Sequence, residues 1–382
     1  MDDSFNLAPD SQQPESPPPR PRSWRRYARW AIALMFVATL CGAYVIRDHV
    51  RSLSSLRRVS GTNAYVMDYY VDYHIDQIRD HGMDVDHVED GLIDVFFPDW
   101  IASIAVGLKG RFLGEKIETI PAKGDRCSTV CLKTPAGRVL FGRNLDYFHD
   151  ACLILRIHRG GVFESIAVLD LHYLNLDRDD LEDTSLITRI PLLFSPYYLQ
   201  DGMNRHGVAV ADMSVQGVEP PYDTSRPDIL HSAAMRLILD DAKNTDEAVE
   251  ILNRYNVHFV AETCHFMIAD ASGKSVVVEF IDGDTKVTPA REAWQVCTND
   301  QIFGVTEEVC DEKCQRYRTA SDQLSKASAA TGMDDVMNVM ESVSKENWTM
   351  WSSVYDLSSK NCRIAYRLQY DKPYDDSLIG TD

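Results

Sequence analysis

Residues 127–146 have the pattern of a β-hairpin with reactive groups at its ends. The segments STVCLK and RVLFGRN flank the turn TPAG, and apolar segments around such turn residues are typical of paired antiparallel strands. If the Pro-Ala dipeptide forms a two-residue turn, Cys127 lies opposite Asn144, between Arg143 and Asp146. The hairpin therefore brings a thiol toward a guanidinium and a carboxylate, which a purely structural hairpin does not need.

The same alternation of strands and turns recurs along the chain and predicts the fold class. LILRIHR and VFESIAVLDL flank a Gly-Gly turn, VAVADMSV follows a His-Gly turn, and HFMIAD and SVVVEF flank ASGK. Helical patterns separate these hairpins: SAAMRLILDDA, then DEAVEILNRY with a capping box at Asn244 and Glu247, then a run over roughly 315–345. Hairpins layered with helices indicate an α+β fold built on antiparallel sheets.

The N-terminus predicts a tail and a membrane anchor. Residues 1–29 are rich in Pro, Ser and Arg and are typical of a disordered, basic, cytoplasmic tail. The uncharged run from Trp30 to Ile46 is just long enough to span a bilayer as a helix. Basic residues before this run predict that the rest of the chain lies outside the cytoplasm. We therefore expect a single-pass protein with a signal anchor at 30–46; the alternative is a cleaved signal peptide.

Two further regions follow the expected anchor. Residues 47–126 form a predicted N-terminal helical segment, in which YVMDYYVDYHIDQIRDHG is the clearest helix and ends at Gly82. His74 and His81 are expected to be packing or surface histidines, because no metal-binding spacing accompanies them. The larger region, residues 127–382, is expected to lie outside the cytoplasm.

Composition and motifs exclude several partners. The net charge of −19 and the lack of a basic run after the first sixty residues argue against nucleic acid. No cofactor is expected, because the chain has neither a dinucleotide-binding glycine motif nor a phosphate-binding loop. No metal is expected either, since the C-x3-C motif has no second pair. In an extracytoplasmic domain, disulfides can form among Cys131, Cys152, Cys264, Cys297, Cys310, Cys314 and Cys362.

The hairpin residues themselves suggest a nucleophile. A nearby cation such as Arg143 lowers the pKa of a thiol, while Asp146 could hold an ammonium or a proton acceptor beside Cys127. No histidine lies in the hairpin, but the α-amine of Cys127 has a suitable pKa if the bond after Arg126 is cut. Cys131 is a poorer candidate, since it lies about 13 Å along the strand. The alternative is a structural Arg–Asp pair beside an inert cysteine.

CSTVCLKTPAGRVLFGRNLDY resembles the nucleophile hairpin of the choloylglycine hydrolase and N-acylethanolamine acid amidase group. It is most similar to the isopenicillin N acyltransferase-like branch of these N-terminal-nucleophile hydrolases. The family pattern is Cys followed by G-R-N-x-D, with sixteen residues from the cysteine to the arginine, as from Cys127 to Arg143. Further similar segments follow in family order: LQDGMNRHGVAVADMSV, CHFMIADASGKSVVVEF, VCTND, CQRY and TMWSSVYDL.

This resemblance implies a four-layer αββα sandwich and a set of site residues. Cys127 would be both nucleophile and, through its freed amine, base, with Arg143 and Asp146 beside it. Asn299 would donate to the oxyanion of the tetrahedral intermediate, and Arg316 matches the late catalytic arginine, with Arg318 as a near alternative.

Two positions depart from the relatives. Bile-salt hydrolases carry Asn where this chain has Ser214, so here only the backbone amide would serve the oxyanion. Arg126 precedes the expected autocatalytic cut, where small residues are more familiar. Cleavage would leave residues 47–126 as an α-subunit or propeptide and residues 127–382 as the catalytic domain that the resemblance implies.

The resulting hypothesis is an amidase that cuts linear C–N amide bonds through a Cys127 acyl-thioester. Its partner would be a small N-acyl amide, with the membrane contacted through the N-terminal helix, and a homo-oligomer is left open. Two alternatives are transfer of the acyl group to an amine and an unprocessed, non-catalytic binding protein with the same fold.

Overall fold

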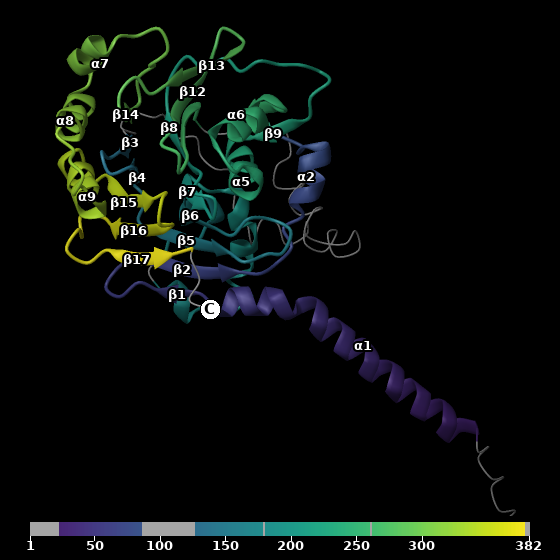
Figure 1. Cartoon of the computed structure of the whole chain (residues 1–382). Coiled ribbons are helices and arrows are strands. Elements are labelled where there is room, and N and C mark those ends of the chain that lie inside the picture. The colour runs from purple at the N-terminus through teal and green to yellow at the C-terminus, as the bar shows by residue number, and fades with distance from the viewer. Residues whose placement is uncertain (1–22, 86–126, 179, 260–261, 379–382) are drawn as a thin grey trace, which may run out of the picture. The chain divides into compact units, whose positions relative to one another are not determined.

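The computed structural model describes residues 23–85, 127–178, 180–259 and 262–378 (Figure 1). The chain divides into two compact units, residues 1–48 and residues 49–382. Helix α1 (Ser23–Ser54) provides the described part of the first unit, so residues 23–29 of the expected tail are helical and the rest of that tail lies outside the described residues.

The expected membrane span is not supported. Helix α1 contains the apolar run, and Trp30, Ile32 and Phe36 are exposed on it. Among the residues that the structure describes, none of the helices has a stretch with both the length and the apolar character that crossing a bilayer requires.

The strands of the second unit form a larger sheet, a smaller sheet and a short parallel pair. The nine-stranded sheet runs in the order β1 (Arg57–Arg58), β2 (Ala64–Tyr69), β5 (Cys152–Ile157), β6 (Ser165–Asp170), β7 (Asp201–Asn204), β8 (Ala209–Ser214), β11 (Cys264–Ala269), β12 (Ser275–Ile281), β13 (Asp284–Pro289). The six-stranded sheet runs β14 (Trp294–Cys297), β3 (Ser128–Lys133), β4 (Val139–Asp146), β15 (Thr349–Asp356), β16 (Asn361–Tyr366), β17 (Tyr374–Ser377). Strands β10 (Asn256–His258) and β9 (Asp228–Leu230) form the parallel pair.

Helices cover the outer faces of the two sheets. They are α2 (Ile75–His81), α5 (His231–Asp241), α6 (Thr245–Asn253), α7 (Glu307–Lys313), α8 (Gln315–Leu324) and α9 (Met333–Ser342), with 3-10 turns η1 (Leu171–Leu174), η2 (Leu181–Asp183) and η3 (Ile190–Tyr197). The cap predicted for α6 is confirmed, because the side chain of Asn244 accepts a hydrogen bond from the Glu247 N–H.

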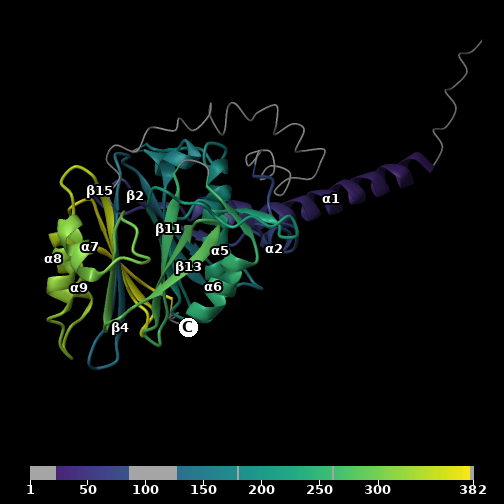
Figure 2. The same ribbon diagram turned by 90° about the horizontal axis from the view of Figure 1, so that it is seen from above.

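Three apolar cores define four layers, which confirms the expected αββα arrangement. One core joins the nine-stranded sheet to α5 and α6, one fills the space between the sheets, and one joins the six-stranded sheet to α8 and α9. Figure 2 shows these layers in sequence, from α7–α9 through the two sheets to α5 and α6. Strand β4 is buried along its whole length because it has a sheet on one face and a helix on the other.

The hairpin register differs by one residue from the prediction. Ser128 pairs with Asn144 and Thr129 pairs with Arg143. The turn has three residues rather than two at its tip, because Gly137 adopts a φ of +83° and so permits a bulge. Continuing this register places Cys127 opposite Leu145, so that Cys127 and Arg143 share one face of the sheet.

One further prediction was wrong. The helix expected up to Gly82 is strand β2 followed by the shorter helix α2, and β2 pairs in parallel with β5. Strand pairing in the buried sheet thus overrides the helical spacing of its tyrosines. Disulfide formation was left open by the sequence, and the described cysteines form no disulfide.

Candidate active site

The site is built around Cys127, which immediately precedes β3. Its side chain is 4% exposed and packs in the core between the two sheets. Arg316, from the second position of α8, donates through Nη1 to the Cys127 carbonyl and to the Ser128 hydroxyl, 2.7 Å away. One guanidinium therefore fixes the backbone at the position that the expected cleavage would turn into a chain terminus.

Arg316 also links Cys127 to two other expected site residues. Its Nη2 donates to Asn299 Oδ1 at 3.0 Å, and its Nη1 lies 3.8 Å from Asp146 Oδ2. The alternative Arg318 is exposed. Of the two late arginines, Arg316 is therefore the one that the structure brings to Cys127.

Asn299 and Ser214, the two residues expected at an oxyanion site, are in direct contact. The Asn299 Nδ2 donates to the Ser214 carbonyl at 2.8 Å. An amide nitrogen carries two hydrogens, so this bond orients the side chain and leaves the second hydrogen for another acceptor.

A buried pair not found from the sequence holds the loop that carries Asn299. His265 Nε2 lies 2.8 Å from the Thr298 carbonyl, and His265 Nδ1 lies 3.3 Å from Glu279 Oε1. The carboxylate of Glu279 in turn accepts the backbone N–H groups of Ile302 (3.0 Å) and Phe303 (2.6 Å). The loop is therefore fixed on both sides of Asn299, by contacts to strands β11 and β12.

Arg143 is fully buried and lies between carboxylates of the other sheet. Its Nη2 donates to Asp212 Oδ1 at 3.2 Å, and its Nε lies 3.8 Å from Asp201 Oδ2. Asp201 also accepts hydrogen bonds from Trp351 (2.8 Å), Ser353 (2.9 Å) and Tyr355 of β15. These contacts connect the two sheets next to Cys127. Sequence reasoning missed both aspartates as partners of Arg143, although both lie in the similar segment LQDGMNRHGVAVADMSV.

Burial dominates the ionisation of the site. Burial raises the pKa of the Cys127 thiol, an effect that the Arg143 charge opposes. Burial also raises the pKa of Asp146 to about 6, opposed by the hydrogen bond from Thr349, and that of Asp212 to about 7, opposed by Arg143. A thiol with a raised pKa is protonated near neutral pH, so Cys127 needs a proton acceptor to become a nucleophile.

Asp146 is placed to hold such an acceptor. Its Oδ1 accepts from the Thr349 hydroxyl at 2.6 Å, whereas its buried Oδ2 accepts no hydrogen bond within the described part of the chain. A buried carboxylate oxygen normally has a donor. An α-amine at Cys127 would be a donor of the right charge.

One group of side chains could hold a metal ion. Asp212, His231 and Cys264 offer an oxygen, a nitrogen and a sulfur that all lie within 4.8 Å of one another. The group adjoins the site, because Asp212 also contacts Arg143.

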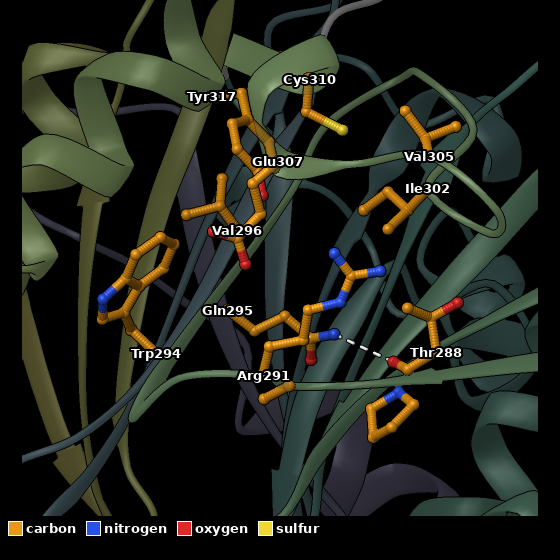
Figure 3. Close-up of a pocket in the computed structure, with 12 residues that line it drawn as sticks. Thr288, Arg291, Trp294, Gln295, Val296, Ile302, Val305, Glu307, Cys310 and Tyr317 are labelled. Carbon is orange, nitrogen blue, oxygen red and sulfur yellow. Dashed lines mark hydrogen bonds between the residues drawn. The ribbon is translucent and has the colours of Figure 1, made fainter.

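A surface pocket lies near the site but does not include Cys127. Figure 3 shows Trp294, Val296, Ile302 and Tyr317 around it, and Gln295 donating to the Thr288 carbonyl at 3.0 Å. Ile302 belongs to the loop of Asn299, and Tyr317 follows Arg316 on α8. The pocket therefore borders the outer side of the elements that carry these two site residues.

Comparisons with known proteins agree with this architecture. Residues 195–368 match the family model of acyl-coenzyme A:6-aminopenicillanic acid acyl-transferase. A penicillin V acylase from Pectobacterium atrosepticum is 28% identical over 115 residues, which span 27% of this chain and only 30% of that relative's length.

Solved structures resemble the fold at low sequence identity. A conjugated bile acid hydrolase from Clostridium perfringens superposes with a TM-score of 0.50 and 14% identity, over 66% of this chain and 92% of that one. A penicillin V acylase from Agrobacterium tumefaciens gives 0.48 and 20%, over 65% and 84%. The chain thus has an α+β fold like that of the N-terminal-nucleophile hydrolases, is similar over 115 residues to a penicillin V acylase, and matches the acyl-transferase family model over residues 195–368.

Proposed function

We propose that the chain is a cysteine amidase that hydrolyses linear C–N amide bonds of small N-acyl compounds through an acyl-thioester at Cys127. The observation that carries this proposal is the convergence on Arg316, which contacts the Cys127 carbonyl and Asn299 and lies 3.8 Å from Asp146. A structural Arg–Asp pair in a hairpin would not require an arginine and an asparagine from two other segments.

In the proposed mechanism, the chain is first cut between Arg126 and Cys127. The freed α-amine, held by Asp146, takes the thiol proton while Cys127 Sγ attacks the substrate carbonyl carbon. The second hydrogen of Asn299 Nδ2 and the backbone N–H of Ser214 stabilise the oxyanion. As the C–N bond breaks, the α-ammonium returns the proton to the leaving amine.

Water then completes the reaction. It attacks the thioester carbon and gives one proton to the α-amine, and the C–S bond breaks to release the acyl group as a carboxylic acid. The α-ammonium then returns its proton to the departing sulfur, so that Cys127 is regenerated as a thiol. If an amine takes the place of water, the same intermediate gives acyl transfer. The match of residues 195–368 to an acyltransferase model is the observation that favours this second candidate.

Two measurements test the proposal. Intact-mass analysis and N-terminal sequencing of the purified chain are expected to find a fragment that begins at Cys127. Hydrolysis of an N-acyl amide panel, with and without added amine acceptors, separates hydrolysis from transfer by product analysis. An uncut chain that hydrolyses none of the panel supports the third reading, a non-catalytic binding protein. The extracytoplasmic location stays a prediction, which cell fractionation tests.

A further inference from the structure

The group Asp212, His231 and Cys264 brings three different donor atoms together from three elements. Asp212 on β8 and Cys264 on β11 are diagonal neighbours on one face of the nine-stranded sheet, because Cys264 pairs with Ser214 and Phe266 with Asp212. His231 is the first residue of α5, which packs on the same sheet. The fold therefore sets the spacing of these donors through the pairing of two central strands.

The distances suit a tetrahedral ion. His231 Nε2 and Asp212 Oδ2 are 3.6 Å apart, and two such ligands on one zinc ion lie about 3.4 Å apart. All three donor atoms lie within 4.8 Å of one another. Because no separation exceeds 4.8 Å, closing the group around an ion requires a shift of at most about one ångström, which side-chain rotation can supply.

Neighbouring groups hold the donors in place. Arg143 binds the Oδ1 of Asp212 and so leaves Oδ2 directed at His231. The His231 ring stacks on Phe259, with centroids 5.2 Å apart. Such contacts orient ligands in metal sites.

The ligand types select the metal. Thiolate and imidazole favour zinc over magnesium or calcium, which take oxygen ligands. Three protein ligands leave a fourth position for water or another group. The site adjoins Cys127 through Arg143, which binds Asp212 at 3.2 Å and lies on the same face of the six-stranded sheet as Cys127.

We propose that Asp212, His231 and Cys264 bind a zinc ion that inhibits the enzyme by occupying the space beside Cys127. Binding replaces the thiol proton of Cys264, which passes to solvent, and no bond is oxidised or reduced. The inhibition rests on the proposed amidase function, whereas the binding does not.

Binding is tested with Co2+ as a spectroscopic probe of the full chain carrying Cys127→Ala, so that the nucleophile cannot supply the thiolate. We expect a thiolate-to-cobalt charge-transfer absorption that added Zn2+ abolishes. Adding Cys264→Ser should remove the absorption, and adding His231→Asn should raise the Kd by more than about ten-fold. Cys314→Ser, which changes a partly exposed thiol on another element, is the matched control and should leave the titration unchanged.

Each result decides the proposal. The site is refuted if the Cys127→Ala chain shows no such absorption, or if the absorption persists after Cys264→Ser. Should Cys264→Ser fail to fold, as judged by circular dichroism, the half-buried His231 decides: an unchanged Kd in His231→Asn overturns the assignment.

An activity assay then separates the metal site from the proposed function. With Cys127 intact, Zn2+ should inhibit amide hydrolysis, and His231→Asn should raise the inhibitory concentration by more than about ten-fold. Equal inhibition of both chains overturns the inhibitory role. Cobalt binding as expected, in a chain that hydrolyses no amide before or after cleavage, removes the amidase function and leaves the metal site standing.

Discussion

Cys127, which immediately precedes β3, and Cys297, on the neighbouring strand β14, are two buried thiols with different surroundings. Cys297 pairs with Thr129 of β3 and lies 3.3 Å from His265 Nε2, and His265 lies 3.3 Å from Glu279. By hydrogen-bond geometry alone, this Cys–His–Glu row resembles the activated nucleophile of a cysteine hydrolase more closely than Cys127 does.

The chemistry points the other way. His265 Nε2 also lies 2.8 Å from the Thr298 carbonyl, which can only accept, so this nitrogen carries a proton and cannot take one from Cys297. Burial raises the pKa of both thiols, and the Arg143 charge opposes the rise at both. The largest contribution after burial differs: the Glu279 charge raises the pKa of Cys297, whereas the Arg143 charge lowers that of Cys127. A thiol next to a histidine is therefore not sufficient for a nucleophile, because the histidine nitrogen must also have a free lone pair that can accept the thiol proton.

The largest expected effect is at Cys127. Cys127→Ala should abolish both chain cleavage and amide hydrolysis, with a loss of at least about a thousand-fold because the attacking atom is gone. Mass spectrometry and a steady-state assay measure the two effects. A cleaved chain in this variant would contradict the assignment, and Cys127→Ser at the unchanged rate would refute the role of the thiol.

Asn299→Ala is expected to have the next largest effect. Removing one oxyanion donor costs about 10²–10³ in kcat, while KM should change little because the ground-state carbonyl is bound elsewhere. Steady-state kinetics on cleaved enzyme give the two constants separately. An effect confined to KM would place Asn299 in substrate binding instead.

The stabilising contributions of Asp146, near Cys127, and of Glu279, near Cys297, should change in opposite directions with pH. The pKa of Asp146 is raised by burial to about 6, so its contribution to stability is fully present below pH 3.8 and is lost as pH rises through about 6. We compare the uncut Cys127→Ala chain with the same chain carrying Asp146→Asn. The free energy of unfolding of the Asp146→Asn chain, relative to that of its parent, should therefore rise as pH increases from 4 to 8, by up to about 3 kcal/mol.

Glu279 should show the reverse. Burial acts to raise its pKa, but the hydrogen bonds from His265 and two backbone N–H groups outweigh burial and lower the pKa. Its stabilising contribution is thus present at neutral pH and is lost in acid, so the cost of Glu279→Gln should shrink as pH falls. Denaturant titrations across pH measure both slopes, and slopes of the same sign would contradict the comparison.

Glu279→Gln should also affect catalysis, because it loosens the loop of Asn299. We expect a fall of about ten-fold in kcat with little change in KM, since a small misplacement of a donor weakens transition-state binding. The effect should disappear in an Asn299→Ala background. Independent, additive losses would show that Glu279 does not act through Asn299.

Cys297→Ala is expected to have the smallest effect. The variant should keep kcat/KM within about three-fold of the parent, because the thiol takes no part in the reaction and its loss leaves only a small cavity. It is the matched control for Cys127→Ala. A comparable loss of activity in both variants would remove the distinction between the two centres.

The sequence was most informative where the chemistry is local. The hairpin, its TPAG turn and the layered α+β architecture all follow from residues close in sequence, and within the hairpin only the turn length was misjudged, by one residue. That residue matters, because it moves Cys127 onto the face of Arg143. The spatial meeting of Arg316 and Asn299 with Cys127 came from a resemblance, since no local pattern places a helix residue beside a strand 189 positions away.

The partners on the other sheet could not be found in this way. The local sequence around these partners predicts only ordinary strand residues at Asp201, Asp212 and His265. Their roles depend on how the two sheets stack and on which side chains then face each other. The N-terminal strand β2 was missed for a related reason, since its pairing partner β5 lies on the far side of Cys127 in the sequence.

The position of β2 has a consequence for the proposed cleavage. Its six residues pair in parallel with β5, and its side chains are almost all buried. A break before Cys127 would therefore create two polypeptides without creating two molecules: the shorter chain would remain an interior strand of the longer one. Breaking a covalent bond and separating the products would be distinct events, and only unfolding would achieve the second.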